Sequence, residues 1–479
     1  MNLEAMLQQF FGYETFRPGQ REIIEALVDG QDVLAILPTG MGKSLCYQLP
    51  GYLFSKPVLI ISPLLSLMQD QVDQLKQRGE KRVVALNSFL SPEQKQYALH
   101  FLHEYRFIFV SPEMLLQPQV KARIEQMELS LIVADEAHCI SQWGYDFRPD
   151  YLRIGEVFVQ PNRPPILALS ATATDTVMED IQHYLNMHAP FCYMHSVNRE
   201  NIYLVKKEFT NKEQKIEWIV DHVSNTSGPG IIYTQSRAKS EAISLQLLER
   251  NIAAAAYHAG KDVQDRQFIQ QQFLTDKLEW IVATNAFGMG VHKDNVRQII
   301  HETMPATVSN YMQEIGRAGR DGVDAVAFLL YAEGDEQFAK FIATEDLPKD
   351  AHIDRFMQVV ANGEQPNVLL TRGELTEVSF RVLTYWLQHE SPEQVKKRMQ
   401  EMQLKKFAEV NLVLKLIEHT DCMREQVVHY FGQQLAQKQQ NCCSNCGVDI
   451  APFMKPREEQ QQTQKTTWQQ RLQQILLRN

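Results

Sequence analysis

The sequence predicts an α/β protein with two parallel-sheet domains in tandem, followed by a mostly helical domain that carries a cysteine cluster. Short apolar runs alternate with longer amphipathic segments through about residue 330. Such runs are typical of strands that are buried on both faces of a parallel sheet and connected by helices. From about residue 345 these runs stop, and the pattern becomes helical up to the cysteines between positions 422 and 446.

The apolar runs form two series, separated by a polar linker near residues 198–201. We expect strands at residues 33–37, 58–61, 83–86, 107–110, 131–134 and 166–169 in the first series, and at 231–234, 254–257, 280–283, 298–301 and 326–330 in the second. The predicted domains cover residues 1–197, 198–342 and 343–450, and residues 451–479 form a glutamine-rich tail. We expect this tail to be loosely ordered, or docked on its own protein, rather than a partner-binding helix.

The composition is that of a globular protein. Of the 479 residues, 44% are apolar, which suffices for a buried core in each domain. The formal charge of −10 argues against a protein that coats nucleic acid through bulk charge, although it is compatible with a local basic groove. The start MNLEAMLQQF lacks the pattern of a signal peptide, and no apolar run approaches the ~20 residues of a membrane span. We therefore expect a cytoplasmic protein without a membrane partner.

A phosphate loop is predicted at LPTGMGKS, between the first strand and a helical pattern. Gly40 and Gly42 let backbone N–H groups close around a phosphate chain, while Lys43 reaches the outer phosphates and Ser44 ligates Mg²⁺. The strict pattern begins with glycine, but this position is Leu37. A chance glycine turn is the alternative, and it leaves the flanking strand and helix unexplained. The residues expected at the nucleotide are Thr39, Gly40, Met41, Gly42, Lys43 and Ser44.

Two carboxylates, Asp135 and Glu136, follow the apolar run 131–134. They are expected at the carboxyl edge of the sheet, beside the phosphate loop on a neighbouring strand. Asp135 is suited to hold Mg²⁺, and Glu136 is suited to orient and deprotonate an attacking water. A solvated acidic loop is the alternative, but it does not explain the phosphate loop. The two segments together predict that a nucleotide is hydrolysed.

The segment QEIGRAGRDG supplies the positive charge that hydrolysis requires. Arg317 and Arg320 are three residues apart and can share one helical face, and Gln313 precedes them. An exposed helix with surface arginines is the alternative. We expect arginine to be donated across a domain cleft, because phosphoryl transfer gains several orders of magnitude in rate from such a group.

The acidic pair continues directly into the aromatic and basic stretch SQWGYDFRPDY. Trp143 and Phe147 offer faces on which unpaired bases can stack, and Arg148 can pair with a phosphate. Ordinary core aromatics are the alternative, but glycine, aspartate and proline interrupt these aromatics as they do in a loop. A base bound there can shift Glu136 or His138, so that a bound strand controls hydrolysis.

Residues 8–335 resemble the superfamily 2 nucleic-acid helicases, and specifically the RecQ family. The matching segments are FGYETFRPGQ, SPLLSLMQDQ, SPE, SAT, IIYTQSR and ATNAFGMGVHK, in the order of the family, and the aromatic-rich loop is similar to the one that marks RecQ enzymes. The resemblance assigns Tyr13, Arg17 and Gln20 to the adenine and Gly290 to the nucleotide cleft. It assigns nucleic-acid contacts to Ser62, Gln69, Ser111, His138, Trp143, Phe147, Arg148, Ser236 and Arg237.

The resemblance implies two RecA-like domains that bind ATP and Mg²⁺ between them and translocate along single-stranded DNA from 3′ to 5′. The implied partners are single-stranded DNA, forked or 3′-tailed duplexes, and single-strand-binding or repair proteins. We therefore expect an ATP-dependent DNA helicase of DNA repair or recombination. Two rivals stay open, a translocase that unwinds little and a non-catalytic clamp or scaffold. The presence of Lys43, Glu136 and Arg320 counts against the clamp.

The segment CMREQVVHYFGQQLAQKQQNCCSNCGVD has the cysteine pattern of a metal site in a reducing compartment. It resembles the zinc module of RecQ enzymes, whose spacing maps onto Cys422, Cys443, Cys446 and Asp449. Zn²⁺ accepts a carboxylate ligand. Cys442 is the alternative fourth ligand, although adjacent residues rarely both turn inward, and four reduced thiols without metal are the other alternative.

The sequence departs from the longer RecQ pattern at three points. The chain ends about 30 residues past Cys446, from which we expect a short form without the winged-helix and HRDC domains. Residues 345–415 contain extra helical sequence, and His292 stands where the family usually has Asp or Asn. The strand-separating part is therefore expected to be missing or rebuilt.

Overall fold

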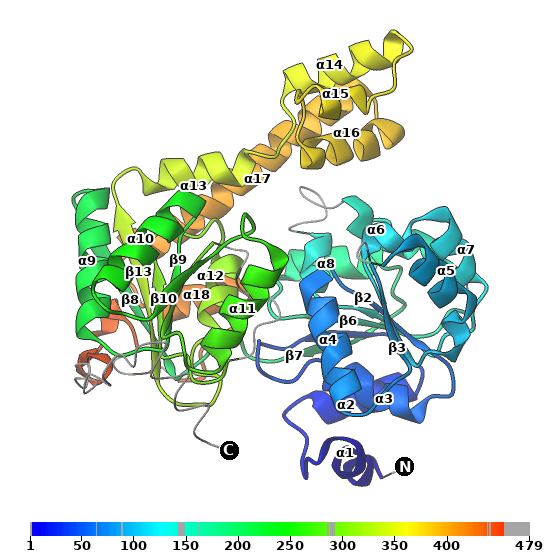
Figure 1. Ribbon diagram of the computed structural model, residues 1–479, viewed down its shortest axis with the longest axis horizontal. Coiled ribbons are helices and arrows are strands. Elements are labelled where there is room, and N and C mark those ends of the chain that lie inside the picture. The colour runs from blue at the N-terminus through cyan, green and yellow to red at the C-terminus, as the bar shows by residue number, and fades with distance from the viewer. Residues whose placement is uncertain are drawn as a thin grey trace, which may run out of the picture.

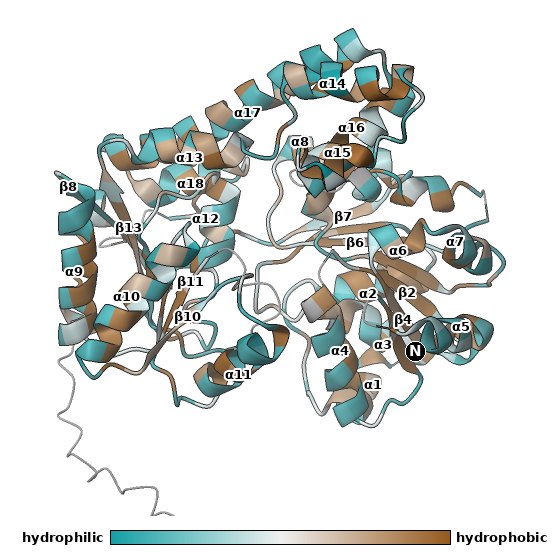
Figure 2. Cartoon of the chain, turned by 45° about the horizontal axis from the view of Figure 1, so that its top comes forward, coloured by the Kyte–Doolittle hydropathy of each residue, from teal (hydrophilic) through white to brown (hydrophobic). Residues whose placement is uncertain are grey.

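A computed structural model describes residues 2–63, 65–87, 90–141, 149–160, 162–284, 287, 293–437, 439 and 442–454. It confirms the predicted fold class, with two parallel-sheet domains followed by a helical region (Figure 1). The strands of both sheets are mostly apolar along their length, and polar residues lie on the outer faces of the helices (Figure 2). Within the described residues, no helix is both long and apolar enough to cross a membrane.

The first domain contains a seven-stranded sheet in the order β3-β4-β2-β5-β6-β1-β7, with every described pair parallel. Its strands are β1 (Val33–Ile36), β2 (Val58–Ile61), β3 (Val83–Leu86), β4 (Phe107–Val110), β5 (Leu131–Ala134), β6 (Ile166–Ser170) and β7 (Phe191–Met194). Its α-helices are α1 (Leu3–Phe11), α2 (Gln20–Val28), α3 (Leu45–Leu53), α4 (Leu65–Gln77), α5 (Pro92–His100), α6 (Pro112–Leu115), α7 (Pro118–Glu125) and α8 (Asp175–Tyr184).

The order of these strands corrects one sequence expectation. The phosphate loop follows β1 and the carboxylate pair follows β5, but these strands are not neighbours, because β6 lies between them. The SAT segment, which begins at the last residue of β6, therefore lies between the two. All three segments meet at the carboxyl edge of the sheet, where ligands bind in open parallel sheets.

The second domain contains a six-stranded parallel sheet in the order β10-β11-β9-β12-β13-β8. Its strands are β8 (Ile202–Phe209), β9 (Gly230–Tyr233), β10 (Ala254–Tyr257), β11 (Trp280–Ala283), β12 (Gln298–His301) and β13 (Ala325–Ala332). The α-helices of this domain are α9 (Lys212–Asn225), α10 (Arg237–Glu249), α11 (Val263–Leu274) and α12 (Val308–Ile315).

The C-terminal region is helical as predicted. It comprises α13 (Asp335–Thr344), α14 (Asp350–Ala361), α15 (Val368–Thr371), α16 (Glu377–His389), α17 (Pro392–Glu418) and α18 (Met423–Tyr430). Figure 1 shows α14 to α16 as a lobe near the far end of α17, next to α6 and α8 of the first domain. On α16, Arg381 lies 3.8 Å from Glu113 and 3.7 Å from Asp150 of that domain.

The helix α17 belongs to two hydrophobic cores. Val395 and Met399, in its first half, pack in the core shared by the lobe and the first domain. Val410 and Val413, in its second half, pack in a core of the second domain. A 27-residue helix is about 40 Å long, so α17 is long enough to connect the two domains outside the linker.

A buried carboxylate, Asp32, ties together the starts of three strands in the first sheet. It accepts hydrogen bonds from Arg163 (2.8 and 2.7 Å) and from the backbone N–H groups of Ile166 and His188 (2.8 Å each). Burial opposes ionisation of Asp32, but the bonds from Arg163, His188 and Ile166 outweigh it and hold its pKa below the usual value.

We predict that Asp32→Ala lowers the free energy of unfolding by about 3–5 kcal/mol, because it removes the partner of a buried guanidinium. Urea denaturation at pH 7 measures this loss. The control Asp221→Ala, which breaks a half-exposed ion pair with Arg250, costs less than about 1 kcal/mol.

The lowered pKa of Asp32 also makes the stability of the fold depend on pH. A lowered pKa gives stability that is fully present above the unfolded pKa, about 3.9, and is lost as the pH falls through the lower folded value. The difference between wild type and Asp32→Asn is therefore constant near neutral pH and shrinks below about pH 4. A difference that already shrinks between pH 7 and pH 5 would contradict this assignment.

Candidate nucleotide and nucleic-acid site

The phosphate loop lies between the end of β1 and the start of α3. Gly40 and Gly42 adopt left-handed backbone angles, with φ of +89° and +75°. A side chain at Gly42 would come within 2.8 Å of the Gln20 amide, and one at Gly40 within 3.4 Å of Arg320. The glycines therefore permit both the turn and the approach of two predicted site residues.

The predicted base, Glu136, meets the phosphate-loop lysine directly. The Lys43 Nζ lies 3.0 Å from Glu136 Oε1, and both side chains are largely buried. Glu136 has φ 49° and ψ 46°, a left-handed conformation that is costly for a residue with a side chain and is found mainly at functional sites. Its backbone N–H donates to Asp135 Oδ1 at 3.0 Å, which fixes the two carboxylates relative to each other.

The two carboxylates have different acidities. Burial raises the pKa of Asp135 to about 6, and the neighbouring charge of Glu136 adds to this effect. Burial also opposes ionisation of Glu136, but the charge of Lys43 outweighs it and holds the pKa of Glu136 below its usual value. Glu136 is therefore ionised at neutral pH, as a general base must be. Asp135 has the higher pKa and would be kept ionised by a bound divalent cation.

The arginine segment approaches this site from the second domain. It follows the end of α12, so Arg317 and Arg320 lie in turns and do not share a helical face as predicted. The Thr39 hydroxyl donates to the Gly316 carbonyl at 2.9 Å across the cleft. Arg317 is buried. Burial, together with the charge of Arg317, lowers the pKa of Arg320 to about 10. Two desolvated guanidinium groups beside a phosphate loop make a favourable position for an anion.

Gln313 lies in the same cleft. Together with Thr39, Thr172 and Arg199 it lines a small cavity between the phosphate loop, the SAT segment and the arginine segment. The structure thus brings the predicted catalytic residues Lys43, Asp135, Glu136, Gln313, Arg317 and Arg320 into one region.

Two of the three predicted adenine residues, Arg17 and Gln20, contact the phosphate loop. Gln20 donates to the carbonyls of Met41 (2.9 Å) and Gly42 (3.1 Å) and accepts from the Arg17 backbone N–H at 2.9 Å. The Arg17 guanidinium bonds the Gly40 carbonyl, and Tyr13 is 54% exposed. These residues therefore lie where a base could bind near the loop, and adenine recognition stays a prediction.

A hydrogen-bonded path joins the carboxylates to the SAT segment. His138 Nδ1 lies 3.1 Å from the Ser170 hydroxyl, which donates to the Thr172 carbonyl at 2.7 Å. Tyr151, at the end of the aromatic stretch, donates its hydroxyl to the Asp135 carbonyl at 3.2 Å. The predicted residues Trp143, Phe147, Arg148, Gly290 and His292 lie outside the described residues.

The remaining nucleic-acid candidates stand close to strand ends. Ser62 follows β2 and Ser111 follows its neighbour β4, and both are buried. Ser111 caps α6, and Ser236 caps α10, whose first residue is Arg237. Gln69, on α4, donates to Asp73 at 3.0 Å. The residues of each domain therefore lie at or near the carboxyl edge of its sheet.

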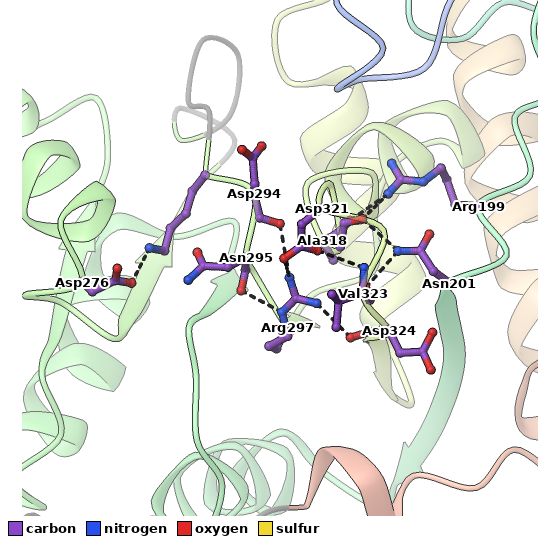
Figure 3. Close-up of polar contacts among 12 residues, drawn as sticks. Arg199, Asn201, Asp276, Asp294, Asn295, Arg297, Ala318, Asp321, Val323 and Asp324 are labelled. Carbon is purple, nitrogen blue, oxygen red and sulfur yellow. Dashed lines mark hydrogen bonds and ion pairs between the residues drawn. The ribbon is translucent and has the colours of Figure 1, made fainter. Parts of the chain in front are cut away.

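Two linker residues that the sequence did not mark as site residues bond the backbone of the arginine segment. Arg199 donates to the carbonyls of Ala318 (3.2 Å) and Gly319 (2.8 Å), and Asn201 donates to the Gly319 carbonyl at 2.8 Å (Figure 3). Downstream, Arg297 contacts the Asp321 carboxylate. These side chains bind the backbone around the two predicted arginines. Arg199 and Asn201 belong to no motif. The signal in the sequence that could have indicated them is the cluster of polar residues in the interdomain linker.

The four C-terminal cysteines converge. The sulfur atoms of Cys422, Cys442, Cys443 and Cys446 all lie within 4.8 Å of one another, and Cys422 is 3.6 Å from Cys442 and 4.0 Å from Cys443. Sulfur atoms that each lie about 2.3 Å from a tetrahedral Zn²⁺ are about 3.8 Å apart, so this set fits zinc. Four thiolates leave no open position, which is typical of a structural site.

The geometry replaces the predicted fourth ligand. Asp449 is exposed, accepts a hydrogen bond from the Ala451 N–H at 2.9 Å and lies outside the cysteine group. Cys442 takes its place, although it is adjacent to Cys443. The Cys442 carbonyl accepts from the Leu204 N–H at 3.1 Å, which anchors this segment to β8.

Comparison with known proteins identifies the family. Residues 17–181 match the DEAD/DEAH box helicase model, residues 214–322 the helicase conserved C-terminal domain, and residues 380–447 the RecQ zinc-binding domain. The chain is 39% identical over 484 residues to a Bacillus subtilis (strain 168) protein named "Probable ATP-dependent DNA helicase RecS", covering 99% of this chain and 97% of that protein. The chain belongs to the RecQ family of DNA helicases. It is accordingly an ATP-dependent enzyme that binds DNA.

Other relatives of this RecQ-family chain match part of their length. The ATP-dependent DNA helicase RecQ of Haemophilus influenzae is 41% identical over 344 residues, which cover 71% of this chain and 55% of the relative. Among solved structures, the DUF1998 helicase MrfA bound to DNA matches with a TM-score of 0.58 at 19% identity, over 71% of this chain and 52% of that chain. The Mycobacterium smegmatis helicase Lhr bound to ssDNA and AMP-PNP matches with a TM-score of 0.57 at 20% identity, over 71% and 49%. These two likenesses show the fold alone.

We predict that the RecQ-family zinc site depends on Cys442 and not on Asp449. Elemental analysis of purified Cys442→Ser protein should find well below one zinc per chain, because a hydroxyl is a poor replacement for a thiolate ligand. The matched variant Asp449→Asn should keep about one zinc, as the wild type does. The reverse pattern would restore Asp449 as the fourth ligand.

Proposed function

We propose that this RecQ-family helicase moves along single-stranded DNA from 3′ to 5′ and unwinds forked and 3′-tailed duplexes in DNA repair or recombination. The observation that carries the proposal is the meeting of phosphate loop and arginine segment across the domain cleft, through Thr39 and Gly316. ATP bound there contacts both domains, so its hydrolysis changes how firmly the two are held together. The Lhr helicase, whose solved structure shares this fold, is bound to ssDNA and AMP-PNP.

The chemical roles follow from the geometry. Lys43 carries the positive charge that cradles the outer phosphates, and Glu136, held ionised beside it, accepts a proton from the attacking water. Arg317 and Arg320 stabilise the negative charge that develops in the transition state. We expect Ser44 and Asp135 to hold Mg²⁺, which when bound would neutralise phosphate charge. Gln313 orients groups within the cleft.

The coupling to DNA runs through the segment that joins the carboxylates to the aromatic stretch. A base stacked on Trp143 or Phe147 displaces a segment whose two ends are fixed near the carboxylates. One end is Glu136 and the other is Tyr151, which is bonded to the Asp135 carbonyl. The bond from His138 to Ser170 carries the same displacement to the SAT segment. Strand occupancy therefore alters the position of the general base.

We predict ATP-dependent release of the labelled strand from 3′-tailed and forked duplexes, and little from a 5′-tailed duplex of the same sequence. The Glu136→Gln variant, which keeps the shape of the side chain and loses the base, should bind the same DNA and release no strand. Equal release from the 5′-tailed duplex would contradict the polarity. DNA-stimulated ATP hydrolysis without any release would favour a translocase that unwinds little.

We predict that Trp143→Ala leaves ATP binding intact and lowers the stimulation of ATP hydrolysis by single-stranded DNA roughly 5- to 160-fold, because base stacking contributes ~1–3 kcal/mol. A coupled ATPase assay with and without oligodeoxythymidine measures the effect. Tyr97→Ala, which removes an aromatic side chain that is 63% exposed on α5, serves as the control. Normal stimulation in Trp143→Ala would remove the coupling role of the stretch.

A further inference from the structure

The linker between the two domains, residues 195–201 between β7 and β8, is hydrogen-bonded along much of its length. Its first residue, His195, donates its N–H to the carbonyl of Ile36, the last residue of β1, at 2.9 Å. The next buried residue, Val197, donates its N–H to the Gln433 side chain at 3.0 Å. The linker therefore starts directly beside the strand that leads into the phosphate loop, and it is fixed there by the segment after α18.

Arg424, a buried residue of α18, holds the middle of the linker. Its guanidinium donates to the Asn198 side chain at 2.7 Å and to the carbonyl of Arg199 at 2.8 Å. Removal of these bonds would free the backbone of Arg199 on that side. The C-terminal region thus holds the middle of the linker.

While Arg424 bonds the backbone carbonyl of Arg199, the Arg199 side chain bonds the arginine segment. It donates to the carbonyls of Gly316 (3.4 Å), Ala318 (3.2 Å) and Gly319 (2.8 Å), just after α12 ends. The carbonyls at the end of a helix lack intrahelical partners, and a guanidinium with a rigid fork of donors satisfies several of them at once. Gly319 has a left-handed φ of +54°, and a side chain there would meet Asn201 at 2.4 Å.

Arg199 is a further charged residue beside the two predicted arginines. It adds a third guanidinium to a group in which the charges of Arg317 and Arg199 both disfavour the charge of Arg320. Such crowding is unfavourable, and the Arg199 guanidinium donates hydrogen bonds to the backbone carbonyls of Gly316, Ala318 and Gly319. A side chain that bonds backbone carbonyls fixes the course of a loop, whereas Arg317 and Arg320 are the arginines that we expect to contact a phosphate.

We propose that Arg199 is a positioning residue for ATP hydrolysis, which holds the backbone of residues 316–319 so that Arg317 and Arg320 reach the nucleotide, and that Arg424 holds Arg199 in turn. The inference rests on the proposed role of Arg317 and Arg320. The linker then sets the spacing between phosphate loop and arginine segment, because it is bonded to β1 at one end and to the arginine segment a few residues later.

The test measures hydrolysis, binding and stability of the full chain. Arg199→Ala should lower kcat for DNA-stimulated ATP hydrolysis at least tenfold, with the KM for ATP and the affinity for single-stranded DNA within twofold of wild type. It should also lose the tight binding of ADP with aluminium fluoride, a mimic of the transition state, and keep the binding of ADP. Arg199→Lys, which retains the charge but not the fork of donors, should recover only part of kcat.

A double-mutant cycle separates positioning from a general structural effect. If Arg199 acts through the arginine segment, Arg199→Ala should cost little further activity in an Arg320→Ala background. Additive losses, or a KM change without a kcat change, would overturn the proposal. Arg250→Ala, which removes a half-exposed arginine of α10's C-terminal end bonded to Asp221, is the matched control and should leave kcat unchanged.

The Arg320→Ala and Arg199→Ala variants together distinguish the proposed role of the arginines from the positioning role of Arg199. If Arg320→Ala alone retains full kcat, the proposed role of the arginines is wrong. If Arg320→Ala loses activity and Arg199→Ala does not, only the positioning role is wrong. Arg424→Lys adds an independent arm, since it should lower kcat in the same direction as Arg199→Lys and retain ADP binding. Normal kcat in Arg424→Lys with an unchanged melting temperature would remove Arg424 from the proposal.

Discussion

The arrangement of the two domains depends on one constraint, which is that two largely buried arginines of like charge, Arg317 and Arg320, are held close together. Arg317 and Arg320 repel each other in a site that is poor in water, and burial lowers the pKa of Arg320 to about 10. Facing them, Lys43 is neutralised by Glu136 at 3.0 Å. Such a site is stable only if the surrounding backbone is rigid, because like charges are costly to bury and their neighbours must be held in place. Rigidity comes from the left-handed glycines, from the cleft bond of Thr39 and from the linker side chains.

The two sheets meet this requirement through their topology. Parallel strands direct all their carboxyl ends to one edge, so three segments of the first sheet converge although β6 separates β1 from β5. The second sheet adds the arginine segment between α12 and β13. Neither edge holds both the phosphate-binding and the arginine groups. A cleft between two domains therefore supplies the complete set only when both domains are correctly spaced.

The sequence predicted the central strands well, because strands buried on both faces read as continuous apolar runs. It missed β7 and β8, which lie at sheet edges: β7 alternates between half-buried and exposed residues, and β8 contains Lys206, Lys207 and Glu208. Motif residues such as Lys43 and Glu136 were predictable because their chemistry demands those side chains. Arg199 was not, since it acts on backbone carbonyls that any sequence possesses. The sequence also did not predict Cys442 in place of Asp449 as the fourth cysteine-site residue, because this depends on how β8 anchors the cysteine segment.

The helix α17 has a mechanical consequence. Its two halves are embedded in different cores, the second half in the second domain and the first half with the lobe of α14 to α16. A rotation of the second domain would therefore carry the first half of α17 with it. Over about 40 Å, a domain rotation of roughly 10° displaces the far end by roughly 7 Å. That displacement far exceeds the reach of the contacts from Arg381 to Glu113 and Asp150. The contacts of Arg381 with Glu113 and Asp150 would therefore be lost in such a rotation unless the lobe stayed with the first domain.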